Sequence, residues 1–231
     1  MIPDWGTIGY TVSVWALPVL IAVTFHEAAH GWVAWKLGDE TAKRLNRVTF
    51  NPFKHLDIFG TIILPAFMLI ASGGRMLFGF AKPVPINPAE FNNPRRDMVL
   101  VAAAGPLTNL GLALLSALSL HAVMVFEGDF REWVASNLIN LVWFNILLFI
   151  FNLLPIPPLD GSRIVAGVLP PSLAHNLFRF ERFGFLIIIC IFFVIPLLIE
   201  RFGFEINIFW WLVGGPAEYI MRYMFSRIGV L

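Results

Sequence analysis

Two histidines and a glutamate, His26, Glu27 and His30, form a His-Glu-x-x-His pattern near the N-terminus. On a helix, residues four apart lie on the same face, so the two imidazoles are placed to hold one metal ion. Glu27 then lies beside the metal, where it is a candidate general base that takes a proton from water. The pattern therefore indicates hydrolysis assisted by a metal.

The pattern lies at the end of an uncharged run, since no residue from 5 to 25 carries a charge. A helix needs roughly 20 apolar residues to cross a lipid bilayer. Ionisable side chains in a membrane segment are energetically costly, and by default they mark a functional site. We therefore expect the hydrolytic chemistry to take place within or near the bilayer.

The composition is that of a protein surrounded by lipid. Of the 231 residues, 58% are hydrophobic and 13% are charged, against roughly 25% charged residues in soluble domains. A core alone does not accommodate this excess, so the outer surface must be apolar as well. The net charge of +1 argues against nucleic acid as a partner. Cys190 is the single cysteine, which excludes a disulfide within the chain.

Uncharged stretches recur along the whole chain. Five are near or above the length of a membrane span, at residues 5–25, 58–74, 98–126, 133–159 and 183–199. A sixth stretch, residues 206–217, is short and is interrupted by Gly-Gly-Pro, so it is a short span, a re-entrant piece or an interfacial helix. We predict an all-α polytopic membrane protein with five to six transmembrane helices, formed by residues 1–231 as a single domain.

Two linking segments differ from the spans. Residues 78–94 contain four prolines, which rule out a regular helix. We predict a small extended or re-entrant structure there, and an ordinary surface loop is the equal alternative. Residues 36–57 are polar and basic. If the N-terminus lies outside, the excess of basic residues on cytoplasmic loops favours the cytoplasmic face for this segment and the nearby site. Four other basic residues would then lie on the other side: Arg75, Lys82, Arg95 and Arg96.

A catalytic zinc usually has three protein ligands and one water, so a further ligand must come from elsewhere. Asp160 directly follows the fourth apolar run, in a stretch where three prolines break the helix. Asp57, at the start of the second apolar run, is a competing ligand. Its alternative is a purely structural role as a helix cap. Asp57 and its neighbour His55 are alternatively second-shell or gating groups near the site.

The combination of His-Glu-x-x-His on a membrane helix with a distant Asn-x-x-Pro-x-x-Pro-x-Asp-Gly stretch resembles the site-2 protease family, peptidase family M50. Further stretches resemble compact prokaryotic members of this family: residues 51–57 with 60–61, residues 81–85 with 87–88, and residues 104–109. The resemblance extends over roughly residues 25–164. No PDZ or CBS domain of the kind that some relatives carry is expected.

This resemblance implies an intramembrane zinc metalloendopeptidase in the cell membrane of a prokaryote. One Zn²⁺ per chain would be held by His26, His30 and Asp160, and Glu27 would be catalytic. The substrates would be transmembrane proteins. Two other functions are compatible with metal ligands in membrane spans: a metal-binding transporter and a non-catalytic scaffold. A transporter usually contains internal repeats, of which none is evident, and a structural zinc site needs no base.

Two asparagines are further candidates for the site. Asn152 lies inside an apolar run, where an unpaired amide is costly. It either bonds neighbouring helices or donates a hydrogen bond to the substrate backbone or the developing oxyanion. Asn109 follows the small residues 102–105, which allow helices to approach closely. We favour a role in helix packing for these residues. For Asn109 the alternative is that its side chain faces the site.

Overall fold

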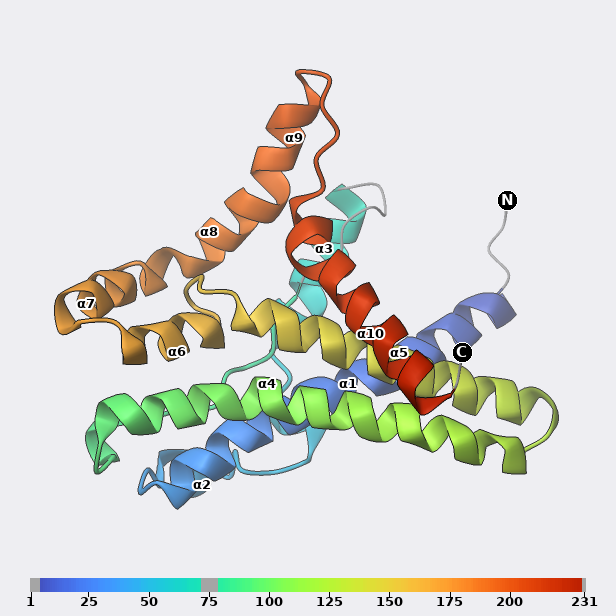
Figure 1. Ribbon diagram of the computed structural model, residues 1–231, viewed down its shortest axis with the longest axis horizontal. Helices are drawn as coiled ribbons and strands as arrows, with labels where there is room; N and C mark the ends of the chain where they lie inside the picture. Colours follow the sequence, from blue (N-terminus) through green and yellow to red (C-terminus); the bar gives the residue numbers. More distant parts are fainter. Residues whose placement is uncertain (1–4, 72–78, 230–231) are drawn as a thin grey trace.

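The computed structural model describes residues 5–71 and 79–229, and within them every regular element is a helix (Figure 1). This confirms the predicted all-α class. In the described part, three helices are long and apolar enough to cross a membrane. They are α1 (Trp5–Lys36), α4 (Pro94–Ser119) with its continuation η4 (Leu120–Val125), and α5 (Gly128–Leu153).

The remaining helices are short. They are α2 (Thr41–Arg44), η1 (Pro52–Lys54), η2 (Ile58–Ile63), α3 (Leu64–Ala71), η3 (Pro88–Glu90), α6 (Asp160–Val168), α7 (Pro171–Arg179), η5 (Glu181–Phe183), α8 (Gly184–Ile189), η6 (Cys190–Val194), α9 (Ile195–Glu200), η7 (Trp210–Gly214) and α10 (Gly215–Ile228). As Figure 1 shows, α8 and α9 extend away from the long helices, whereas α10 crosses over α5.

The three long helices run side by side, and α4 contacts α1, α5, α6 and α10 (Figure 1). Small buried residues on α4 permit this close packing, among them Ala113 and Ala117, which meet Val142 and Ile146 of α5. Leucines at other positions of α4 are exposed, including Leu107. Small residues thus face the neighbouring helices while large apolar residues face outward, which is the arrangement of an integral membrane protein.

The predicted number of five to six spans is not confirmed. Beyond the three long helices, one further candidate consists of the pair Pro171–Glu181 and Gly184–Glu200, which is bent by 80°. In the residues that the structure describes, the predicted second span consists of η2 and α3, of six and eight residues. At 1.5 Å per residue these reach about 21 Å, less than the roughly 30 Å of the hydrocarbon core. Residues 72–74 of that prediction lie outside the described part of the chain.

The C-terminal stretch that was predicted as a short span, a re-entrant piece or an interfacial helix is divided between two elements. The π-helical η7 passes directly into α10 at Gly215. The uncharged run ends at Glu218, which forms an ion pair with Arg222 on α10. The inner side of α10 packs through Ala217 and Phe225 onto the core formed by α4 and α5.

The predicted extended segment is confirmed for residues 79–87, which form neither helix nor strand; residue 78 lies outside the described part. The backbone of this extended segment is held by the protein on one side. The N–H of Phe80 donates to Gly60 O (3.0 Å), and the N–H of Lys82 donates to His55 O (2.9 Å). The segment is therefore fixed against the polypeptide that follows α1 and is not a free surface loop.

Candidate metal centre and active site

Three predicted ligands from two distant parts of the chain meet in the structure. His26 and His30 lie on one face of α1, and Asp160 is the first residue of α6. The two Nε2 atoms are 3.0 Å apart, and Asp160 Oδ2 lies 3.2 Å from the first and 3.3 Å from the second. Ligand atoms about 2.0–2.1 Å from a tetrahedral zinc are about 3.3 Å from one another. The spacing therefore fits one zinc ion.

The hydrogen bonds of the two imidazoles set their tautomers. His30 Nδ1 donates to the backbone oxygen of Val101 (2.7 Å), and His26 Nδ1 donates to Asn109 Oδ1 (2.6 Å). With the protons on Nδ1, each Nε2 directs a lone pair toward the centre. Asp160 Oδ2 is buried and has no hydrogen-bond partner among the described residues. Three electron-rich atoms thus face one another, an arrangement that a bound cation stabilises.

The helix break after α5 positions Asp160. Prolines 155, 157 and 158 prevent the helix from continuing beyond Leu153. Gly161 is required because a Cβ there would collide with the backbone oxygen of Leu153. At the other end of α6, the guanidinium of Arg95 donates to Gly167 O (2.8 Å) and to Leu169 O. Helix α6 is therefore fixed at both ends, and its first residue is held beside α1.

Glu27 lies next to this group, on the wall of a central cavity of about 1290 Å³ that the three candidate ligands also line. Its Oε2 accepts a hydrogen bond from the backbone N–H of Val84 (2.8 Å). Val84 belongs to the extended segment, so this segment fixes the carboxylate of the candidate base. The sequence pattern placed Glu27 near the metal, but the partner that orients it lies 57 residues away.

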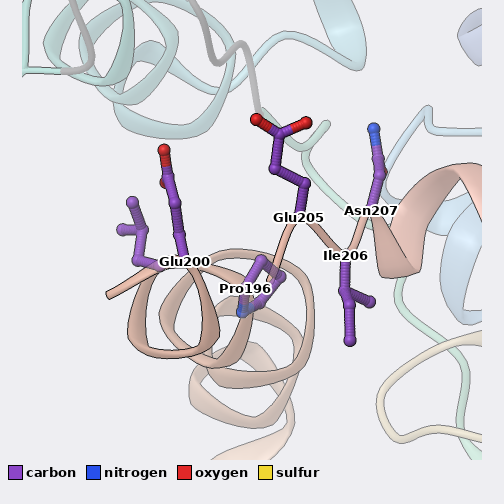
Figure 2. Close-up of a pocket in the computed structure, with 6 residues that line it drawn as sticks. Pro196, Glu200, Glu205, Ile206 and Asn207 are labelled. Carbon is purple, nitrogen blue, oxygen red and sulfur yellow. The ribbon is translucent and has the colours of Figure 1, made fainter. Parts of the chain in front are cut away.

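The central cavity is bounded mainly by apolar side chains of α1, α5, α8 and η6. An ion pair between Arg163 and Glu181 (2.7 Å) also lies on its wall. The central cavity shares three lining residues with a smaller hollow of about 320 Å³ at the turn between α9 and η7 (Figure 2): Pro196, Ile206 and Asn207. Figure 2 shows the carboxylates of Glu200 and Glu205 directed to the same side of this hollow.

The other predicted site residues take different positions. Asn152 lines the central cavity, and its Nδ2 donates to Leu148 O one turn earlier (3.1 Å). His55 is buried at the same cavity, and its Nε2 donates to Thr49 O (2.9 Å). It supports the site through its backbone oxygen, which holds the extended segment.

Asp57, the competing ligand, caps a helix instead. Its Oδ1 accepts from the N–H of Gly60 (2.7 Å) at the start of η2. In the part of the chain that the structure describes, the group able to hold a metal consists of His26, His30 and Asp160. In the structure, Asp57 therefore has the structural role of a helix cap, which was one of the alternatives considered from the sequence.

Two residues of α4 lie directly against the histidines. Asn109 faces the site, since its Oδ1 accepts from His26, whereas we had favoured a packing role. Gly105 lies directly against the imidazoles, because a Cβ there would be 2.5 Å from His26 Cε1 and His30 Nε2. Both belong to α4, and their spacing of four residues, which puts them on one face, was the available signal.

Comparison with known proteins agrees with this geometry. A family model described as Peptidase family M50 matches residues 120–197. "Putative zinc metalloprotease YwhC" of Bacillus subtilis is 40% identical over 185 residues, covering 78% of this chain and 80% of the relative. The chain belongs to peptidase family M50. This membership confirms the site-2 protease family that the motifs predicted, and with it the predicted class of enzyme, a zinc metalloprotease.

Two further relatives of this M50 protease match it over very different lengths. Rip2 of Mycolicibacterium smegmatis, also named as a zinc metalloprotease, is 28% identical over 202 residues, covering 87% of this chain and 74% of the relative. MJ0611 of Methanocaldococcus jannaschii is 38% identical over 68 residues, covering 28% of this chain and 31% of the relative. No solved structure matched the chain significantly.

The close approach of α4 to the histidines leads to a first prediction for this M50 protease. Gly105→Ala is expected to weaken zinc binding by about 5-fold to 150-fold, because overpacking a filled site costs roughly 1–3 kcal/mol. The added methyl group would displace both imidazoles. The zinc affinity of the solubilised protein, measured by competition with a chelator, checks this.

Gly111→Ala is the matched control, since it lies on the same helix and a Cβ there meets nothing within 4 Å. It is expected to retain the affinity of the wild type. Wild-type affinity in Gly105→Ala would show that the imidazoles do not need the space.

Proposed function

We propose that the protein hydrolyses peptide bonds of transmembrane substrates within or near the bilayer, and that residues 1–231 act as one membrane domain. Zinc would be held by His26, His30 and Asp160. The observation that carries this proposal is the convergence of three metal-binding atoms on the wall of a cavity between lipid-facing helices. Family membership supplies the class of reaction.

Each protein group has a distinct task in this reaction. A bound zinc ion supplies an acidified water and a polarised carbonyl group. Glu27 takes the proton from the attacking water and delivers it to the leaving amine. The N–H of Val84 holds one oxygen of the Glu27 carboxylate in place during both transfers. Asp160 adds a negative charge that helps to retain the cation.

The position of the site along α1 supports cleavage inside the bilayer near one face. Lys36 Nζ lies over the rings of Trp32 and Trp35, at 5.7 and 4.9 Å from their centroids. Tryptophan and lysine at a helix end are typical of the membrane interface. His30 precedes Lys36 by six residues, which corresponds to about 9 Å along a helix. The basic residues of segment 36–57 favour the cytoplasmic side for this face.

The substrate must be extended where it is cut, because a helix keeps its carbonyl groups hydrogen-bonded. The central cavity, at about 1290 Å³, has room for an unwound stretch of chain and for water beside it. Glycine or proline near the cleavage position lowers the cost of unwinding. Transmembrane segments that carry such residues are therefore the proposed substrates. The bacterial and archaeal relatives support a prokaryotic cell membrane as the location.

Purified protein in proteoliposomes tests the proposal. A model transmembrane segment that contains a Gly-Pro pair should be cleaved in the presence of zinc and spared after a chelator removes it. The same segment with the pair replaced by leucines should be cleaved more slowly, because unwinding then costs a few kcal/mol more. Zinc flux across the liposome membrane without cleavage would instead favour the transporter.

A further inference from the structure

We propose that Asn145 of α5 is a positioning residue for the metal centre, which orients the amide of Asn109 and through it the imidazole of His26. The inference deepens the proposed function, because it assumes that His26 binds the metal. Neither side chain is accessible to solvent, at 0% exposure for both asparagines. Water therefore does not replace the bonds between them.

A directional chain of hydrogen bonds leads from α5 to the metal-facing histidine. Asn145 Nδ2 donates to the backbone oxygen of Leu141 (2.8 Å). Asn145 Oδ1 accepts from Asn109 Nδ2 (2.7 Å). Asn109 Oδ1 in turn accepts from His26 Nδ1 (2.6 Å). The chain crosses from α5 through α4 to α1, so it joins the three long helices at the metal centre.

The chemistry of each group fixes the direction of this chain. A backbone oxygen only accepts hydrogen bonds, so Leu141 O requires the nitrogen of the Asn145 amide. The Asn145 oxygen then faces Asn109 and requires the nitrogen of that amide. The backbone oxygen of Ala22 also accepts a hydrogen bond from Asn109 Nδ2, at the longer distance of 3.2 Å. Only the Asn109 oxygen is left for His26, which must therefore carry its proton on Nδ1.

A reversed Asn109 amide would damage the metal site. Its N–H would face His26 Nδ1, and the imidazole proton would move to Nε2. That proton would point at His30 Nε2 and Asp160 Oδ2, which lie 3.0 and 3.2 Å away, and would block the lone pair that binds the metal. Asn145 opposes this reversal, and Ala22 O also opposes it, but more weakly because its hydrogen bond to Asn109 Nδ2 is longer. We therefore expect a partial loss of zinc affinity when Asn145 is removed. Residues that hydrogen-bond to a metal ligand typically contribute about 10-fold to 100-fold to metal affinity.

Helix α5 contains a matched control for this inference. Asn140 donates from Nδ2 to the backbone oxygen of Val14 on α1 (2.9 Å). It is the same residue type on the same helix, but it bonds directly to α1 and takes no part in the hydrogen-bond chain through Asn109 to His26. Its loss should therefore affect the packing of α1 on α5 and leave the metal site intact.

The test compares Asn145→Leu, Asn145→Asp and Asn140→Leu as solubilised, zinc-free proteins. Zinc affinity is measured by competition with a chelator, histidine tautomers by ¹⁵N NMR of the imidazole nitrogens, and stability by thermal unfolding. Asn145→Leu should bind zinc about tenfold more weakly and show a His26 population protonated on Nε2. Asn145→Asp keeps an acceptor for Asn109 Nδ2 and should bind zinc within about threefold of the wild type.

Equal zinc affinity of Asn145→Leu and the wild type would overturn the inference. So would an equal loss in Asn145→Leu and Asn140→Leu, since that would reflect helix packing alone. His26→Ala separates this failure from that of the proposed function, because it should lose zinc whatever Asn145 does. If His26→Ala retained zinc, the metal site itself would be wrong.

Discussion

Glu27→Gln is expected to lower the rate of peptide cleavage by about 10²–10⁴-fold while zinc stays bound, the range typical for removal of a general base. The amide of glutamine does not take a proton from water, although it has the shape of the carboxylate. Its oxygen still accepts the hydrogen bond that Val84 N–H donates to Glu27 Oε2. The extended segment should therefore keep its position, and the loss should be confined to proton transfer.

Cleavage in proteoliposomes and the zinc content of the same preparation measure the two effects separately. Glu132→Gln, an exposed residue at the start of α5, is the control for removing a carboxylate far from the central cavity. It should cleave at the wild-type rate. Normal turnover by Glu27→Gln would remove Glu27 from the role of base, while a loss of zinc in this variant would mean that it also holds the metal.

Asp160→Ala should lower zinc affinity by more than about a hundredfold and abolish cleavage. Asp160 supplies one of the three atoms that face the metal position, and its loss leaves only two histidines from a single helix. Residues that only hydrogen-bond to a metal ligand already contribute about 10-fold to 100-fold to metal affinity, so a direct ligand should contribute more. Zinc per chain after dialysis against a weak chelator measures this effect.

Asp57→Asn is the matched control for Asp160→Ala, since Asp57 was the competing ligand in the sequence. Asparagine is as good a helix cap as aspartate, so it preserves the hydrogen bond to Gly60 that starts η2. This variant should keep the full zinc content. The opposite result, zinc lost from Asp57→Asn and kept by Asp160→Ala, would reassign the ligand.

The sequence alone determined the parts of this site that depend on neighbouring residues. His26 and His30 share a helix face because a helix repeats every 3.6 residues, and α1 contains both as predicted. Three prolines predicted the break that places Asp160 at the start of a new helix. The apolar runs predicted the three long helices, because covering the backbone in lipid requires uninterrupted helix.

The tertiary structure alone decided which distant groups complete the site. Asn109 meets His26 across 83 residues, and Val84 meets Glu27 across 57. Contacts of this length depend on how helices pack, and no local pattern encodes their partners. Uncharged stretches likewise predicted more spans than there are long apolar helices in the described part of the chain, because hydropathy records apolar character but not whether a stretch continues as one straight helix. Packing decided between two aspartates that the sequence offered as a ligand, placing Asp160 beside the two histidines and Asp57 at a helix cap.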